Sequence, residues 1–377
     1  MGYRNHGASS RSMAQRLLYA ASAPFESARR IDDAGPRLQR LHGHSFLSKL
    51  RLWAPPAADG SGLGPFPGAE VDALRERLKD CVAPLDYQLL NDHLGSPTDE
   101  NLARWIRERI DLRAVDVVGI QSTRWQGVDL DANDCAHVWR RYQFESAHRL
   151  PKVGPDHKCG RMHGHGFAVI LHADATPGAL RIDVDLLDRL WAPLQRLLHN
   201  ACLNEIAGLE NPTSERIASW IWEQIRPQLP ALRWVTVYET ATCGAHFDGQ
   251  RYRIWKEFGL DSSVRMRHAP AGDGRRRIHG HSYRLRLHLA APLDLVYGWT
   301  IDFGDVKELF APVFARLDHH RLDELPGVAD AGAAAIVHWV RQQAVDRLPQ
   351  LERIDLYETP GCGVILAWGQ ELPALPI

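Results

Sequence analysis

The triplet His-Gly-His occurs three times in this chain of 377 residues, at positions 42–44, 163–165 and 279–281. The first two triplets are 121 residues apart, and the second and third are 116 apart. Other landmarks recur in the same order, namely Phe-Glu-Ser-Ala at 25–28 and 144–147, and the pairs Gln121-Ser122, Glu239-Thr240 and Glu358-Thr359. Because solenoid repeats are only about 20–50 residues long, this longer period predicts three small domains of one fold.

The repeat boundaries follow from loop-like joints. The segments 126–134 and 248–250 are rich in Gly, Asp and Asn, as loops are. We place the three repeats at 15–125, 136–248 and 250–370. They follow a polar tail, 1–14, that we expect to be loosely ordered.

The second repeat indicates how one unit folds. Three of its segments have strand character, and its apolar residues at helical spacing predict helices. The predicted elements are strands at 137–146 and 166–173, helices at 186–198 and from the N-cap Thr213 to 225, and a strand at 234–240. This order is typical of an α+β unit with an antiparallel sheet covered on one face. One small sheet leaves open edges, and three units could satisfy one another's edges by closing a ring.

Composition narrows the class of protein. Lys and Arg total 45 and Asp and Glu total 46, so the net charge is −1 and does not indicate a nucleic-acid surface. The N-terminus has no apolar run typical of an export signal, and no segment reaches the roughly 20 apolar residues of a membrane span. The six cysteines include no Cys-x-x-Cys pair. We therefore expect a cytoplasmic protein with reduced thiols that binds neither nucleic acid nor membrane.

The second repeat carries a possible metal site. His163 and His165 are two residues apart at a strand start, so both imidazoles point to one face. His148 follows the neighbouring predicted strand, and a hairpin would bring it across. Three imidazoles with one open position are typical of catalytic zinc. Cys159, four residues before His163, could be a fourth ligand or a base beside the metal. The plainer interpretation is that His-Gly-His is only a turn and a strand start.

The other two repeats lack parts of this pattern. Arg29 and Val264 stand where the second repeat has His148, and Leu38 and Arg275 stand where it has Cys159. Neither repeat can build the same three-histidine site. We expect the histidines of their triplets to make structural hydrogen bonds.

At these motifs the chain resembles the 6-pyruvoyltetrahydropterin synthase and 6-carboxytetrahydropterin synthase family, over nearly its whole length. The resemblance rests on Phe144 to His148, Cys159-x-x-x-His163-Gly-His165, Asn211-Pro-Thr-Ser-Glu215, Asp302-Phe303-Gly304 with Lys307, Leu317-Asp318-His319, and the Glu-Thr pairs 239–240 and 358–359. Family members are single-copy chains whose trimers close into a twelve-stranded barrel, the T-fold, and two trimers stack. The resemblance implies a covalent pseudo-trimer with helices outside, and a homodimer would form a pseudo-hexamer.

The resemblance also implies roles for individual residues. Zn²⁺ would be held by His148, His163 and His165, with Cys159 as the proton-abstracting base. Asp318 and His319 match the Asp-His pair that assists proton transfer. The glutamate that anchors the pterin matches Glu358, next to Thr359, or Glu239.

The parts are divided among the repeats. The second repeat reads Leu198-His199 at the Asp-His position, and the first has Asp86-Tyr87 there and Gln121 at the glutamate position. Family sites lie between neighbouring subunits. We therefore expect a single site between repeats two and three, with repeat one structural.

The three residues between Cys159 and His163 resemble the 6-carboxytetrahydropterin branch. The resemblance thus implies a zinc-dependent lyase that acts on the small-molecule pterin 7,8-dihydroneopterin triphosphate, on the route to queuosine. The alternatives are a 6-pyruvoyltetrahydropterin synthase activity and a zinc- and pterin-binding pseudoenzyme that regulates a partner.

Overall fold

The computed structural model describes residues 15–32, 34–53, 63–154, 156–175, 182–294, 298–328 and 332–369. The predicted tail, 1–14, lies outside these ranges. Within the described residues, none of the helices combines the length and the apolar character needed to cross a membrane.

Each repeat contains two long antiparallel strands, two helices and a final strand pair. The first comprises β1 (Arg16–Arg29), β2 (His42–Trp53), α1 (Glu70–Val82), β3 (Gln88–Leu89), α2 (Asp99–Arg109), β4 (Val115–Thr123) and β5 (Gln126–Asp131). The second comprises β6 (Ala136–His148), β7 (His163–Ala175), α3 (Val184–Leu198), β8 (Ala201–Cys202), α4 (Ser214–Ile225), β9 (Leu232–Thr240) and β10 (Cys243–Phe247). The third comprises β11 (Tyr252–Val264), β12 (His279–Ala290), α5 (Phe303–Phe314), α6 (Ala333–Ala344), β13 (Leu351–Thr359) and β14 (Cys362–Ala367).

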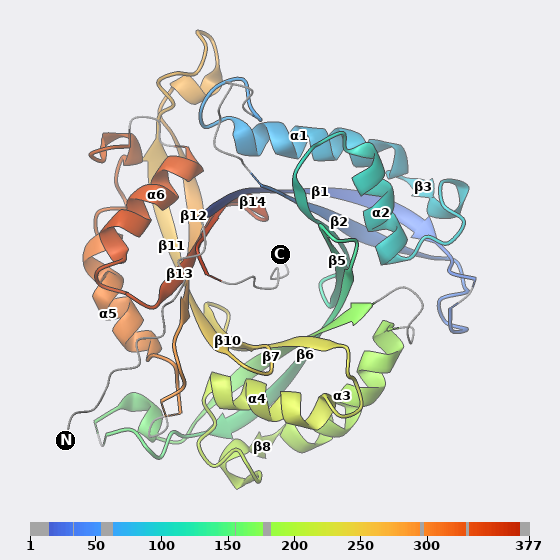
Figure 1. The fold of residues 1–377 in the computed structure, drawn as a ribbon, viewed down its shortest axis with the longest axis vertical. Coiled ribbons are helices and arrows are strands. Elements are labelled where there is room, and N and C mark those ends of the chain that lie inside the picture. The colour runs from blue at the N-terminus through green and yellow to red at the C-terminus, as the bar shows by residue number, and fades with distance from the viewer. Residues whose placement is uncertain are drawn as a thin grey trace, which may run out of the picture.

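The strands close into one antiparallel barrel with the helices outside it (Figure 1). Apart from the two-residue strands β3 and β8, twelve strands form the wall within the described residues. The loop expected at 126–134 is wrong for residues 126–131, which form β5 because they pair with both β4 and β6. Three seams join the repeats, through the pairs β5–β6, β10–β11 and β14–β1. The closed T-fold ring expected from the sequence is confirmed, and pairing between repeats removes the open edges.

Local sequence explains the helices of the second repeat. Helix α4 begins after Thr213, whose hydroxyl accepts the backbone N–H of Arg216, and this confirms the predicted N-cap. Helix α3 begins two residues earlier than predicted, because Asp183 caps it by accepting the N–H of Leu186.

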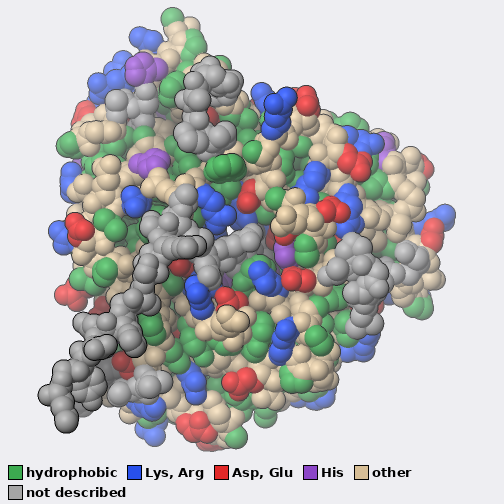
Figure 2. Space-filling model, in the orientation of Figure 1, with side chains coloured by type: hydrophobic (Ala, Val, Ile, Leu, Met, Phe, Trp, Pro, Cys, Tyr) green, Lys and Arg blue, Asp and Glu red, His purple; other side chains and the backbone are tan. Residues whose placement is uncertain are grey.

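The strands alternate between two environments. One side of each strand packs under the helices in an apolar core that includes Leu50, Val118 and Ile217. The other side faces the barrel interior, which holds a separate cluster around Trp139 and Trp255. On the outer surface, basic and acidic side chains are interspersed over the face drawn in Figure 2.

Candidate functional site

Three histidines meet at the end of the β6–β7 hairpin. His148 is the cross-strand partner of His163, and His165 lies two residues further along β7. The ring centroids are 4.5 to 5.1 Å apart, and one ligand atom from each residue lies within 4.8 Å of the others. The strand register alone therefore brings together the three imidazoles predicted from the sequence.

Backbone carbonyls orient two of these rings. His148 Nδ1 lies 3.1 Å from the carbonyl of Pro212, and His163 Nδ1 lies 2.8 Å from that of Arg161. A proton on Nδ1 leaves Nε2 as a lone-pair donor. The Nε2 of His148 is buried and has no hydrogen-bond partner. Burial lowers the pKa of His148 to about 4, so this ring is neutral at pH 7. These features fit a divalent metal such as zinc.

Cys159 lies in a 3-10 turn (Lys158–Gly160) on the loop between β6 and β7, close enough to Glu239 for the two groups to interact electrostatically. Its backbone N–H donates to the ring of His157, which fixes the turn. Burial raises the pKa of the Cys159 thiol, and the charge of Glu239 raises it further. The protein alone therefore favours the neutral thiol, and a nearby cation would be needed to favour the thiolate.

Two carboxylates of the second repeat complete this group. Glu239 Oε1 is 3.6 Å from His165 Nε2, and Glu239 Oε2 accepts a hydrogen bond of 2.5 Å from Ser214. Glu215 is buried, and it accepts the backbone N–H of Thr300 at 2.6 Å. Burial raises the pKa of Glu215 to about 7.

The third repeat supplies the opposite wall through the segment before α5. Thr213 donates to the carbonyl of Gly298 at 2.6 Å, and His157 Nε2 is 3.5 Å from a carboxylate oxygen of Asp302. The histidine cluster thus lies at the seam of repeats two and three.

The sequence reasoning did not assign roles to Glu215, His157 and Asp302. For Glu215 and Asp302 the sequence did contain a signal, because both belong to motifs quoted for the family resemblance. Only the seam contacts show that they face the cluster.

Glu358 lies at a different seam. Burial raises its pKa to about 7, and the charges of Asp72 and Glu70 on α1 raise it further. These neighbours belong to repeat one, so Glu358 and the exposed Thr359 lie between repeats three and one. Of the two glutamates considered from the sequence, Glu239 is the one beside the histidines.

Asp318 and His319 are also separate from the cluster of the second repeat. Asp318 accepts the backbone N–H of Asp261 at 3.0 Å, and the exposed His319 ring lies 3.0 Å from the Asp318 carboxylate. A shallow pocket contains His319 together with His281, the third repeat's counterpart of His165. The pair therefore belongs to the hairpin end of its own repeat.

In the second repeat, the pair that corresponds to Asp318-His319 lies one residue later than the sequence comparison suggested. A serine hydroxyl donates to a leucine carbonyl at the same place in repeats two and three, from Ser146 to Leu198 and from Ser262 to Leu317. The second repeat therefore carries His199-Asn200 at this position, and the expected Leu198-His199 is wrong.

The glutamate position of the first repeat shifts in the same way. The pairing between the last two strands skips one residue in each repeat, and that residue is Ser122, Glu239 or Glu358. Ser122 therefore stands at the glutamate position, where the sequence had suggested Gln121.

Arg29 takes the place of His148 in the first repeat. It lies opposite the first histidine of its triplet, as His148 does. Its guanidinium donates to the carbonyl of Pro97 at 2.9 Å, whereas the His148 ring contacts that of Pro212. The guanidinium therefore occupies the space that the ring fills in the second repeat.

This guanidinium is held by a buried ion pair with Asp99 at 2.6 Å. Burial lowers the pKa of the neighbouring His44 to about 4, and the charge of Arg29 lowers it further. Because arginine stays protonated and has no lone pair to donate, this position cannot supply a ligand to a metal ion.

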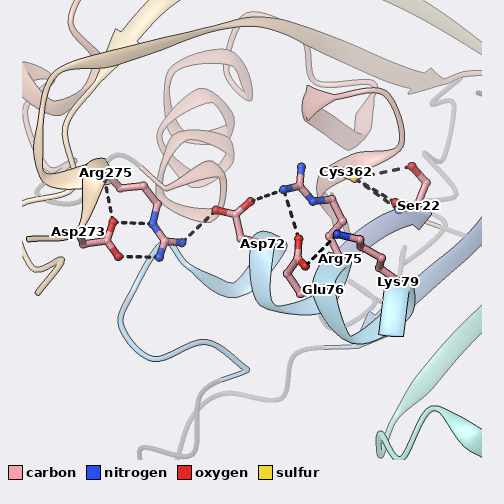
Figure 3. Close-up of polar contacts among 8 residues, drawn as sticks. All are labelled: Ser22, Asp72, Arg75, Glu76, Lys79, Asp273, Arg275 and Cys362. Carbon is pink, nitrogen blue, oxygen red and sulfur yellow. Dashed lines mark hydrogen bonds and ion pairs between the residues drawn. The ribbon is translucent and has the colours of Figure 1, made fainter. Parts of the chain in front are cut away.

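At the third seam, Arg275 takes the place of Cys159. The N–H of Arg275 donates to the side chain of Asp273 within a matching 3-10 turn, Gly274–Arg276. The guanidinium pairs with Asp273 and reaches Asp72 on α1 at 3.0 Å, as Figure 3 shows. With Val264 in place of His148, this seam is closed by ion pairs.

A second group of possible metal ligands lies between repeats one and two. Cys135, His137 and Asp174 have ligand atoms within 4.8 Å of one another. His137 Nδ1 is 2.7 Å from Asp174, and its Nε2 is 3.5 Å from Asp131. Burial lowers the pKa of His137, but the hydrogen bond and charge of Asp174 outweigh it, so the pKa is raised. This arrangement favours an imidazolium between two carboxylates.

Comparison with known proteins places the chain in a family. The family model described as 6-pyruvoyl tetrahydropterin synthase matches residues 20–126, 137–250 and 253–367. A 6-carboxy-5,6,7,8-tetrahydropterin synthase from Synechocystis sp. is 36% identical over 123 residues, which are 30% of this chain and 94% of that protein.

Two solved structures are similar to parts of this chain. The 6-pyruvoyl tetrahydropterin synthase of Caenorhabditis elegans has a TM-score of 0.29 and 16% identity, over 31% of this chain and 95% of that chain. A uricase from Bacillus fastidious has a TM-score of 0.31 and 12% identity, over 58% of this chain and 81% of that chain. Since the three matches to the family model together span most of the sequence, this chain belongs to the 6-pyruvoyl tetrahydropterin synthase family, in three tandem copies.

Proposed function

We propose that the chain is a zinc-dependent pterin lyase with one active site, at the seam of repeats two and three. One observation carries this proposal. Three imidazoles lie together at this seam, and the buried Nε2 of one of them has no hydrogen-bond partner. Glu239 lies 3.6 Å from another, and the Cys159 thiol is on the loop of the same hairpin. The other two seams have Arg29 or Val264 where this one has His148.

The chemistry divides among the side chains of the site. A zinc ion held by His148, His163 and His165 would supply Lewis acidity at an oxygen of the substrate side chain. Cys159, as thiolate, removes a proton from the carbon beside that oxygen. Glu239 accepts hydrogen bonds from the amino and ring N–H groups of the pterin, a task that suits a carboxylate.

For the pterin anchor we favour Glu239 over Glu358. Glu239 shares a seam with the histidines, and its second oxygen is oriented by Ser214. Glu358 and Thr359 would face the third seam, where ion pairs replace the metal ligands. A pterin-binding role for Glu358 would therefore need a second site.

For the substrate we propose 7,8-dihydroneopterin triphosphate, and for the product 6-carboxytetrahydropterin. The similarity to the Synechocystis enzyme supports this branch, as does the spacing of Cys159 and His163. The test is to incubate the purified, zinc-loaded protein with this substrate and to identify the product by mass spectrometry. A 6-pyruvoyl product would move the chain to the other branch. Pterin binding without turnover would favour the pseudoenzyme.

We further propose that Asp318 and His319 act across an interface between two copies of the chain. The His319 ring is exposed, and its contacts lie at the hairpin end of its own repeat. If two barrels stack as a homodimer, this pair can face the histidine cluster of the other copy.

Complementation tests this arrangement. Cys159→Ser and Asp318→Ala should each be inactive alone, and a mixture should regain part of the activity, because one hybrid site keeps both groups. A Cys159→Ser chain mixed with wild type is the control for dilution. Full activity of Asp318→Ala alone would exclude a catalytic role for the pair.

A further inference from the structure

Glycines mark the inner wall of the barrel where one repeat meets the next. Gly127 pairs with Trp139 at the first seam, and Gly244 pairs with Trp255 at the second. An added Cβ would meet the Trp139 ring at 2.6 Å and the Trp255 ring at 2.3 Å. Both indoles are fully buried, so each ring lies over its glycine and fills the interior there.

The third seam keeps the glycine and lacks the ring. Gly363 pairs with Ala20, at the position that corresponds to the two tryptophans. A cavity of about 240 Å³ opens at this point, and its apolar wall includes Ala20, Val117 and Ile365. The strands around it, β1, β2, β13 and β14, lie side by side in Figure 1. Because Ala20 stands opposite Gly363 in place of a tryptophan, the third seam has an empty space where an indole lies at the other two seams.

Positive side chains line this space. Its described lining contains one carboxylate, Asp129, and five cations, Lys49, Arg51, Arg284, Arg286 and Arg353. Each arginine of this lining forms an ion pair with an acidic side chain. Arg51 pairs with Asp116 and Arg353 pairs with Asp355, while Arg284 and Arg286 both pair with Glu257. Within this set the cations outnumber the acids by five to four.

Lys49 is the cation with spare bonding capacity. Its ammonium lies 2.9 Å from Asp129 Oδ1, yet neither atom makes a hydrogen bond. The side chain is only 10% exposed. An ammonium has three N–H donors, and leaving them unmade inside a protein is costly. The cavity therefore offers buried donors to an incoming acceptor.

We propose that this cavity, the interior anion pocket, binds a small phosphate-type anion. Its volume equals that of about eight waters and is below the roughly 300–1,000 Å³ of sites for larger organic ligands. Guanidinium groups match phosphate oxygens in geometry, and an apolar wall strengthens charge interactions. Several cations converging on one space favour an anion of more than one negative charge. This site is distinct from the histidine cluster and does not depend on it.

The test is isothermal titration of the full chain with inorganic phosphate and with diphosphate. Wild type should bind at least one of them, more weakly at high salt. Ala20→Trp restores the ring seen at the other seams, and it should abolish binding while melting temperature and circular dichroism stay native. Ala20→Trp that binds like wild type, or a wild type that binds neither probe, overturns the proposal.

A charge variant keeps the test decisive if Ala20→Trp fails to fold. Lys49→Met should weaken binding about tenfold, the effect of losing one charge-assisted hydrogen bond. Lys79→Met is the matched control, because Lys79 is an exposed cation on α1, outside the barrel. Lys79→Met should bind like wild type. Equal weakening by both variants would mean that the anion responds only to overall charge, and that the pocket is no site.

Discussion

The first and second repeats carry different side chains, Arg29 and His148, at the same position of the fold. In the second repeat, His148 presents an unpartnered Nε2 to two more imidazoles. In the first, Arg29 fills the same space and is neutralised by the buried Asp99. The local fold is alike, so the difference lies in side-chain chemistry. An imidazole leaves a lone pair available to a metal ion, whereas a guanidinium paired with a carboxylate offers none.

The largest expected effect comes from the triplet histidines. His163→Ala should remove about one zinc per chain and reduce turnover to background, because a two-histidine site holds zinc weakly. His279→Ala changes the same position of the third repeat and should leave zinc and turnover unchanged. Elemental analysis and the product assay measure both. Zinc retained in His163→Ala would mean that other residues bind the metal.

The next effect concerns the thiol. Cys159→Ser should lower kcat by about 10²–10⁴-fold, the range for loss of a general base, while zinc content stays the same. Cys81→Ser, on α1 of the first repeat, is the matched control and should keep wild-type kcat. A parallel loss of zinc in Cys159→Ser would instead identify the sulfur as a ligand.

Arg29→His tests directly whether the residue at this one position explains the difference between the first and second repeats. It would place a third imidazole beside His42 and His44, with Asp99 as an additional carboxylate. We expect zinc content to rise from about one to about two per chain. Without metal the variant should be less stable by about 3 kcal/mol, because Asp99 loses its buried partner. A zinc content that stays at one would show that the seam differs in more than Arg29.

The smallest effect is a pH dependence at the third seam. Burial, with Asp72 and Glu70, raises the pKa of Glu358 to about 7, above its ordinary value of 4.5. The folded state therefore keeps a proton that the unfolded state loses, and stability falls as pH rises from about 4.5 to 7. Glu358→Gln should stabilise the protein by about 3 kcal/mol at pH 8 and have little effect at pH 4. Chemical unfolding at the two pH values measures this, and an equal effect at both would exclude the titration.

Repetition made the fold predictable from sequence. Three copies of the same landmarks indicated three equal units, and the edge problem of each sheet indicated a closed ring. The triplet and its hairpin partner placed His148, His163 and His165 together, because cross-strand register is a local property.

Contacts between repeats could not be predicted in the same way. The spacing gave no means to decide which seam Glu239 or Glu358 faces, since both follow the same motif. One-residue errors at Leu198 and Gln121 arose because the pairs were matched by residue type. The register is fixed only by contacts that the repeats share, namely the serine–leucine hydrogen bond and the residue skipped between the last two strands. The gap at Ala20 is visible only once Gly363 is known to lie across from it.

Joining three subunits into one chain has a consequence for how such a protein can change. In a ring of identical subunits, a single substitution appears at every interface at once, so replacing one metal ligand by arginine would disable all sites together. In this chain, each interface is formed by different residues of the sequence, so a substitution changes only one of them. Arg29, Arg275 and Ala20 could each arise alone while the second repeat kept its three histidines. The covalent ring thereby frees two of its three interfaces to acquire new roles.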